Sequence, residues 1–143
     1  MSIQTAFALT TTTYNAGALD LSFAGTGTTQ VYFAGSNWSM ANGVAIDSQG
    51  RLLIAAKVGT PGGSRFGLAR LLEDGSADLV FGHQGSVIGQ FEHGFEAMGG
   101  KVHVLDDGRI LLAGLHYENA HRTLPALALF DQDGRPAQGF GDN

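Results

Sequence analysis

Histidine is the first residue type to consider for chemistry, because its imidazole serves as a metal ligand and as a general base near neutral pH. The five histidines show no tight two-residue spacing, and structural zinc needs four convergent ligands. His103 lies between Val102 and Val104, so in an alternating strand it faces away from both. We therefore expect solvated or hydrogen-bonded imidazoles, no metal site and no cofactor. The histidines are His83, His93, His103, His116 and His121.

Two acidic stretches, 72–75 and 131–134, begin like calcium loops because carboxylates precede a glycine. An EF-hand needs oxygen ligands at loop positions 1, 3 and 5, glycine at 6 and glutamate at 12, and neither stretch continues in that way. We expect turns instead. Asp20 and Asp78 recur at equivalent places along the chain, which favours capping of backbone N–H groups over a catalytic carboxylate pair.

Nucleophile and phosphate motifs are also missing from the sequence. No serine stands in the Gly-x-Ser-x-Gly context of a nucleophile elbow. The glycine-rich stretches 25–27 and 59–63 lack the Lys-Ser/Thr ending and the helix of a phosphate-binding loop. We therefore predict no catalytic residues and a protein that is not an enzyme.

Composition narrows the classes further. Of 143 residues, 43% are hydrophobic and 15% are charged, which is enough for a packed core. A net charge of −5 with only 8 Lys and Arg disfavours nucleic acid as a partner. Residues 1–9 have neither a basic region nor a long apolar run, so we expect no signal peptide and no membrane anchor. The absence of cysteine fits a reducing cytoplasm without excluding export.

The elements that must position any site read as strands. The 22 glycines interrupt every candidate helix, and no stretch carries the 3.6-residue apolar period over ten residues. Between the glycines lie short runs rich in strand-forming residues, which predict an all-β chain of eight strands. These are Thr28–Phe33, Val44–Ile46, Leu52–Val58, Phe66–Leu72, Val87–Phe91, Val102–Leu105, Ile110–Leu115 and Leu124–Phe130.

Self-similarity organises these strands into a repeat of about 58 residues. The positions Gly17, Asp20, Leu21, Phe23, Gly27, Phe33, Met40, Val44, Gly50, Arg51, Leu53 and Ala55 recur as Gly75, Asp78, Leu79, Phe81, Gly85, Phe91, Met98, Val102, Gly108, Arg109, Leu111 and Ala113. After one inserted residue, Leu68, Ala69 and Asp74 recur as Leu127, Ala128 and Asp133, and a third unit opens with Gly134 and Phe140.

Each unit therefore has four strands, with a tight hairpin between the second and third at 47–50 and 106–108. That arrangement predicts four-stranded antiparallel β-propeller blades, two per chain. The predicted division is an N-terminal strand or clasp at 1–16, blade repeats at 17–74 and 75–133, and the start of a third repeat or a tail at 134–143.

Three stretches carry a family resemblance: Gly-Ala-Leu-Asp-Leu-Ser-Phe at 17–23, the run 66–82 from Phe-Gly-Leu-Ala-Arg-Leu-Leu to Phe-Gly, and Asp-Gly-Arg-Ile-Leu-Leu-Ala-Gly at 107–114. Most of the chain thereby resembles the bacterial delta-60 repeat family. The resemblance implies a propeller-like fold and no assigned catalytic residues. The chain departs from the pattern at Ala137, where the repeats carry Asp20 and Asp78, and at 92–99.

Ring closure requires more than this chain, because propellers use typically four to eight blades. Three chains could form a six-bladed ring and two a four-bladed one, or the chain could open a longer protein. We favour self-association as a dimer or trimer. Residues 7–9 precede Gly17 much as 66–68 precede Gly75, which predicts an N-terminal strand that clasps a neighbouring blade.

The loops that differ between the repeats form the candidate site, because binding faces escape the packing rules of blades. The first-to-second and third-to-fourth strand connections emerge on the same side of an antiparallel blade. There an aromatic ring can stack on a sugar while amides and carboxylates bind its hydroxyls. Alternatively, Trp38 and Phe95 fill the gap between blades. The candidate ligand-binding residues are Asn37, Trp38, Phe95, His116, Tyr117 and Glu118.

Three functions follow, in order of preference. The first is a non-catalytic interaction module whose loop face binds a protein or a polymer. The second is a carbohydrate-binding lectin in which an oligomer multiplies weak sites. The third is an enzyme with a site on the propeller axis, for which the innermost runs 28–30 and 86–90 are only mildly polar.

Overall fold

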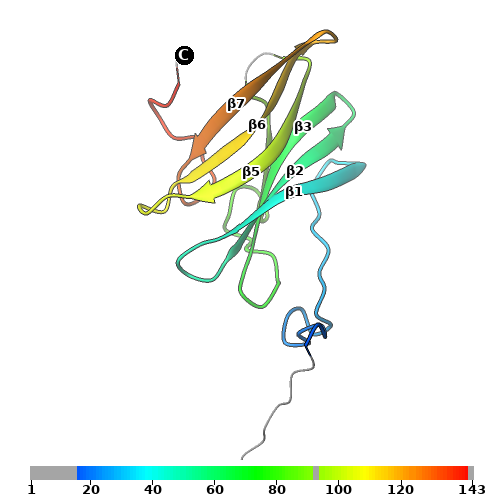
Figure 1. Ribbon diagram of the computed structural model, residues 1–143, viewed down its shortest axis with the longest axis vertical. Coiled ribbons are helices and arrows are strands. Elements are labelled where there is room, and N and C mark those ends of the chain that lie inside the picture. The colour runs from blue at the N-terminus through cyan, green and yellow to red at the C-terminus, as the bar shows by residue number, and fades with distance from the viewer. Residues whose placement is uncertain (1–15, 92–93, 142–143) are drawn as a thin grey trace, which may run out of the picture.

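A computed structural model describes residues 16–91 and 94–141. These residues form two stacked antiparallel sheets: sheet A has the order β1-β2-β3-β4 and sheet B the order β5-β6-β7 (Figure 1). The described residues contain no helix, so none is present that could cross a membrane. The all-β prediction is confirmed. The strands are β1 (Trp38–Ile46), β2 (Leu52–Thr60), β3 (Gly63–Leu71), β4 (Ser86–Gly89), β5 (Glu96–Val104), β6 (Ile110–Asn119) and β7 (Arg122–Phe130).

The predicted hairpins between β1 and β2 and between β5 and β6 are confirmed. Gly50 and Gly108 adopt φ angles of 77° and 84°, which only glycine takes without steric cost. Asp47 Oδ1 also accepts the N–H groups of Gln49 and Arg51, both at 2.9 Å. Turn chemistry local to the sequence therefore sets both strand registers.

The predicted composition of a blade is wrong in one respect. The fourth strand of sheet A is β4, which belongs to the second sequence repeat and pairs with β3, Val87 lying opposite Leu68. The predicted strand Thr28–Phe33 joins no sheet, and sheet B has three strands. β4 occupies the outer edge of β3, and the segment that ends at Phe33 instead packs on a face of sheet A. The predicted N-terminal clasp at 7–9 lies outside the described residues.

The main core lies between the two sheets. Strand β5 runs against β1, β2 and β3, so sheet B covers one face of sheet A (Figure 1). Three rings hold the centre: Phe66 lies 4.9 Å from Phe91 and 6.0 Å from Phe130, between ring centroids. The aliphatic side chains around them come from both sheets. They are Leu53, Ala55 and Leu68 from sheet A, and Ala97, Val102, Ile110 and Leu112 from sheet B.

A second, smaller cluster covers the opposite face of sheet A. Phe33 packs there against Ala56, Val58 and Ala69, with Val31 beside it. The segment before β1 therefore lies on the face of sheet A that points away from sheet B.

Matching irregularities bring β1 and β5 close together. The register shifts between Ala41 and Gly43 in β1, and between Gly99 and Lys101 in β5. A Cβ on Gly43 would come within 2.5 Å of the Gly100 carbonyl oxygen, so only glycine permits this contact. Because each bulge adds one residue, the side chains after it point to the opposite face of the sheet from the one that strict alternation would give.

Candidate functional site

The loops gather at one end of the sheets. Trp38, the first residue of β1, lies opposite Gly59 near the end of β2, and Glu96, the first residue of β5, lies opposite Tyr117 near the end of β6. The β2–β3 and β6–β7 hairpins therefore turn at the same end as the entries to β1 and β5. This confirms the prediction that both loop classes emerge on one side.

At this loop end, Lys57 lies between aromatic rings from two sheets. Its Nζ is 6.0 Å from the centroid of the Trp38 ring and 5.4 Å from that of Tyr117. The same Nζ lies 3.7 Å from Glu96 Oε2. Cation–π contacts of this kind stabilise by about 0.5–1 kcal/mol each at exposed sites. Lys57 was not predicted as a site residue, although it is the one charged residue in β2 and the next repeat has Leu115 at its position.

Trp38 and Tyr117 both reach Lys57 because the aromatic residue of the equivalent strand pair lies on the first strand in one repeat and on the second strand in the other. Trp38 faces Gly59 across the β1–β2 pair, whereas Glu96 faces Tyr117 at the equivalent β5–β6 pair. A Cβ on Gly59 would come within 2.1 Å of the Trp38 indole nitrogen, so the indole lies directly over the glycine. The missing side chain at Gly59 therefore makes the position of Trp38 possible.

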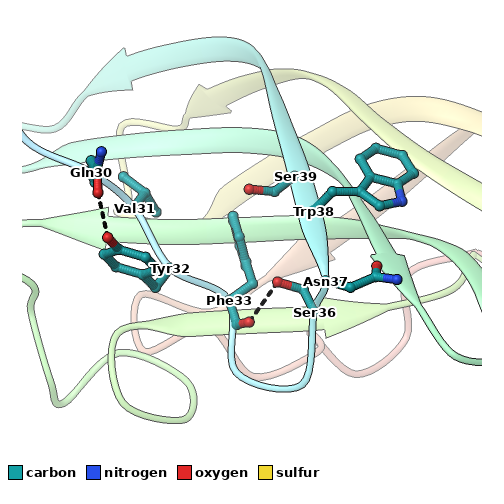
Figure 2. A pocket seen from close by; sticks show the side chains of 8 residues that line it. All are labelled: Gln30, Val31, Tyr32, Phe33, Ser36, Asn37, Trp38 and Ser39. Carbon is teal, nitrogen blue, oxygen red and sulfur yellow. Dashed lines mark hydrogen bonds between the residues drawn. The ribbon is translucent and has the colours of Figure 1, made fainter.

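A groove of about 540 Å³ lies beside the Trp38 ring (Figure 2). Its lining is polar at the rim: Ser36 Oγ donates to the Phe33 carbonyl at 2.8 Å, and the Tyr32 hydroxyl donates to Gln30. Figure 2 shows Trp38 at the far end of the groove from Tyr32, with its indole directed away from Phe33. The groove is lined by Gln30–Phe33 and Ser36–Ser39.

Five of the six predicted site residues lie at the loop end. Asn37 is exposed, Trp38 is 47% exposed and Phe95 is 64% exposed. Tyr117 is half-buried, and Glu118 pairs with Arg122 at 3.0 Å. The alternative that Trp38 and Phe95 fill the gap between the sheets does not hold for Phe95, because Phe66 and Phe91 occupy the centre of that gap.

The sixth predicted residue, His116, does not reach the loop surface. It is only 6% exposed, and its ring lies so close to Gly94 that a Cβ there would come within 2.1 Å of it. Its Nδ1 has no hydrogen-bond partner among the described residues. Its place in the repeat is that of Val58, a core residue, which explains the burial.

A buried ion pair near the opposite end of the sheets was missed by the sequence reasoning. Arg70 is 2% exposed, its Nε lies 2.7 Å from Asp78 Oδ2, and it donates to the Gln132 carbonyl. Its guanidinium lies 4.5 Å from the Phe81 ring centroid. These contacts join sheet A to the last turn of sheet B. Paired changes could have revealed it, because Leu129 and Ala137 replace both partners in the next repeat.

Asp20, Asp74 and Asp131 support turns, as predicted. Asp131 Oδ1 accepts the N–H groups of Asp133 and Arg135, both at 2.9 Å, and Asp20 Oδ1 accepts that of Ser22 at 3.0 Å. Burial raises the pKa of Asp131, but these N–H donors and the Arg135 charge outweigh it and lower the pKa below 3.8. Within 16–91 and 94–141, no three potential ligands gather as a metal site.

Comparison with known protein families gives one match. Residues 48–81 match a family described as a domain of unknown function (DUF5122) beta-propeller. The matched stretch holds β2, β3 and the loop that leads to Phe81. Searches of curated proteins and of solved structures found no match. The match and the two stacked antiparallel sheets indicate a propeller-like repeat protein.

Proposed function

We propose that this protein is a non-catalytic binding module in which β-propeller blades present a ligand site at their loop end. The observation that carries the proposal is the exposure of Trp38 and Phe95 on that end, beside the Lys57–Glu96 ion pair. Burying an exposed aromatic side chain against a ligand is favourable, and loops are free of the constraints that shape the blade interior.

The charged groups near these rings support binding rather than bond-making chemistry. Lys57 is balanced by Glu96, and Glu118 by Arg122. A general acid or base acts best when it can exchange a proton with its substrate at the working pH. Paired charges instead fix the rim of the site and supply hydrogen-bonding atoms to a ligand. We assign no catalytic residue.

A carbohydrate is the second candidate ligand, and one juxtaposition favours it. The half-exposed indole of Trp38 follows the exposed amide of Asn37 directly in the chain, and Figure 2 shows both at the same end of the groove. An apolar sugar face stacks on an indole, while an amide binds hydroxyl groups. Self-association would multiply the weak affinity of one such site.

The experiment uses Trp38 as its own probe, because it is the one tryptophan in the chain. Indole emission is recorded while oligosaccharides, and separately unstructured peptides, are added. A saturable change in emission is expected for at least one class, with the ligand recovered unaltered by mass spectrometry. Chemical conversion of the ligand would contradict the non-catalytic assignment.

Variants locate the site. Tyr117→Ala should weaken binding at least tenfold while leaving the Trp38 probe in place, because it removes the ring on the other side of Lys57. His121→Ala is the matched control, since His121 is exposed in the neighbouring hairpin but outside the aromatic group. If calorimetry shows that Tyr117→Ala and Trp38→Ala both bind the ligand with unchanged affinity, the ligand does not bind at this aromatic group.

Two finer assignments belong to the same proposal. We propose that the units are delta-60-type repeats, a resemblance supported by the recurrence of Gly, Asp and Phe in both blade repeats. We also propose that blades from more than one chain complete the ring. This is supported by the number of strands that two repeats supply, because propellers typically need four blades or more.

A further inference from the structure

The outer part of β7 and the equivalent part of β3 differ strongly in burial. Leu68 of β3 and Leu127 of β7 occupy the same repeat position, yet Leu68 is 0% exposed and Leu127 is 57% exposed. Leu68 is covered because it lies in the core between the two sheets, next to the edge where β4 pairs with β3. No described strand pairs with the outer edge of β7, which is therefore an open template for a further strand.

The outer face of sheet A shows the complementary difference. Val44 of β1 and Val102 of β5 are also equivalent, and their exposed fractions are 64% and 9%. Val102 is buried because the inner face of sheet B packs on sheet A. Val44 and the 68% exposed Ile46 lie on the face of sheet A that has no sheet against it.

Within the described residues, the chain also contains a copy of β4 that pairs with no strand. Residues 28–31 are the repeat equivalent of β4, and they join neither sheet. Phe33 follows them as Phe91 follows β4, and it already packs against Ala56 of sheet A. Both halves of the β3–β4 interaction are thus present a second time, each without its partner.

We propose that residues 28–31 of a second copy of this chain pair antiparallel with the outer edge of β7. The β3–β4 register, in which Leu68 faces Val87 and Gly67 faces Ile88, carries over by repeat position. It places Thr29 of one copy opposite Leu127 of the other and Gln30 opposite Ala126. This proposal identifies the surfaces behind the proposed self-association and is independent of the ligand site at Trp38.

Strand pairing brings the two exposed faces together. When residues 28–31 lie along β7, the outer face of sheet A with Val44 and Ile46 comes onto the outer face of sheet B with Leu127. The contact repeats the stacking of sheet B on sheet A. Because the two surfaces differ, the association is head-to-tail, and a constant rotation closes it into a ring. Two to four chains give four to eight blades, the usual range.

The backbone contacts can be assigned from the template. Arg70 N–H donates to the Gly85 carbonyl at 3.0 Å, and in an antiparallel pair the hydrogen-bonded positions alternate. Leu68 and Val87 therefore exchange both bonds, and so should Leu127 and Thr29 of a second copy. The N–H of Thr29 thus points at β7 of the other copy, and the Thr29 side chain makes no hydrogen bond of the strand pair.

Light scattering on a sizing column tests the assembly. We expect a constant mass of two to four times the 14.9 kDa chain mass across concentrations. Leu127→Asp should reduce it to one chain without unfolding, because the side chain is exposed in the single chain. Leu79→Asp is the matched control and should stay assembled, since Leu79 is 69% exposed at the junction already formed. A monomeric wild type would overturn the proposal.

Two further variants test the strand itself. Thr29→Pro removes the N–H that should bond to Leu127 and should give a monomer, whereas Thr29→Ala keeps it and should assemble. Because the chain has no cysteine, the single variants Gln30→Cys and Ala126→Cys can also be mixed and oxidised. We expect a disulfide-linked pair at least tenfold above a mixture of Gln30→Cys with Leu79→Cys. Assembly of Thr29→Pro, or equal crosslinking in both mixtures, would overturn the register.

Discussion

Sheet A and sheet B are built from equivalent stretches of the two repeats, yet their junctions with the next unit differ. Sheet A receives β4 and buries the Arg70–Asp78 ion pair at that edge. At the same place sheet B has Leu129 and Ala137 and three strands. Burial at a repeat position therefore depends on the neighbouring unit and not on the residue alone.

The turns differ in a related way. In the first repeat the acidic partner of the arginine is Asp47, at the start of the turn, with its side chain 6% exposed. In the second it is Asp107, inside the turn and 53% exposed. Both carboxylates lie 2.7 Å from the arginine Nε. The same ion pair is thus made by different backbone positions, with different degrees of burial.

The largest expected effect comes from replacing only the arginine of the Arg70–Asp78 pair by the leucine found at the equivalent position of sheet B. Arg70→Leu leaves the Asp78 carboxylate buried with only Arg51 at 3.7 Å, so we expect a loss of about 3–5 kcal/mol in the free energy of unfolding. The double variant Arg70→Leu, Asp78→Ala copies Leu129 and Ala137 and should recover most of it. Urea denaturation at one protein concentration measures both. Equal losses in the single and double variants would mean that the pair is not coupled.

The next prediction separates burial within the chain from burial in the assembly. Leu68→Ala should cost about 2–5 kcal/mol, because it opens a cavity in the core between the two sheets. In the Thr29→Pro background, Leu127→Ala should change the free energy of unfolding by about 0.5 kcal/mol or less, since the side chain is exposed there. Similar costs for both, measured by urea denaturation, would show that an intramolecular contact covers Leu127.

Acid stability should distinguish the two turns. Burial raises the pKa of Asp47, but hydrogen bonds from Arg51 and Gln49 outweigh it and hold the pKa below the ordinary 3.8. Its contribution to stability is therefore complete above pH 3.8 and is lost as the pH falls through the lowered value. Asp47→Asn should cost about 1.5 kcal/mol at pH 7 and progressively less in acid. Asp107→Asn should cost less, because Asp107 is exposed. Urea denaturation from pH 7 to 2 measures both, and a pH-independent cost would contradict the assignment.

The smallest effect concerns the aromatic site. Gly59→Ala places a Cβ where the Trp38 indole lies, so the ring must move away from β2 while the strand remains. We expect a shift of the Trp38 emission to longer wavelength, with a change in the free energy of unfolding below about 1 kcal/mol. Gly62→Ala in the neighbouring hairpin is the control, because the space around it holds only the end of Arg65 and the Thr60 hydroxyl. An unchanged spectrum for Gly59→Ala would mean that the indole does not lie over this glycine.

Residue types and spacing were enough to predict the parts of this protein that depend on short-range chemistry. The repeat period, the all-β class and the hairpins at Gly50 and Gly108 follow from residues that act on their own backbone. The outward direction of His103 and the gathering of loops at one end follow from strand alternation and hairpin connection. Most of the loop-end residues were found for the same reason.

Which strand completes which sheet depends on contacts between units and could not be predicted from either repeat. β4 has no local property that commits it to β3 rather than to its own repeat, and the choice depends on the edge available when the sheets stack. The same holds for Lys57 and for the Arg70–Asp78 pair, whose partners lie on other strands or loops. His116 was misassigned because stacking buried its position in the repeat. Contacts between units are long-range, so one unit's pattern does not encode them.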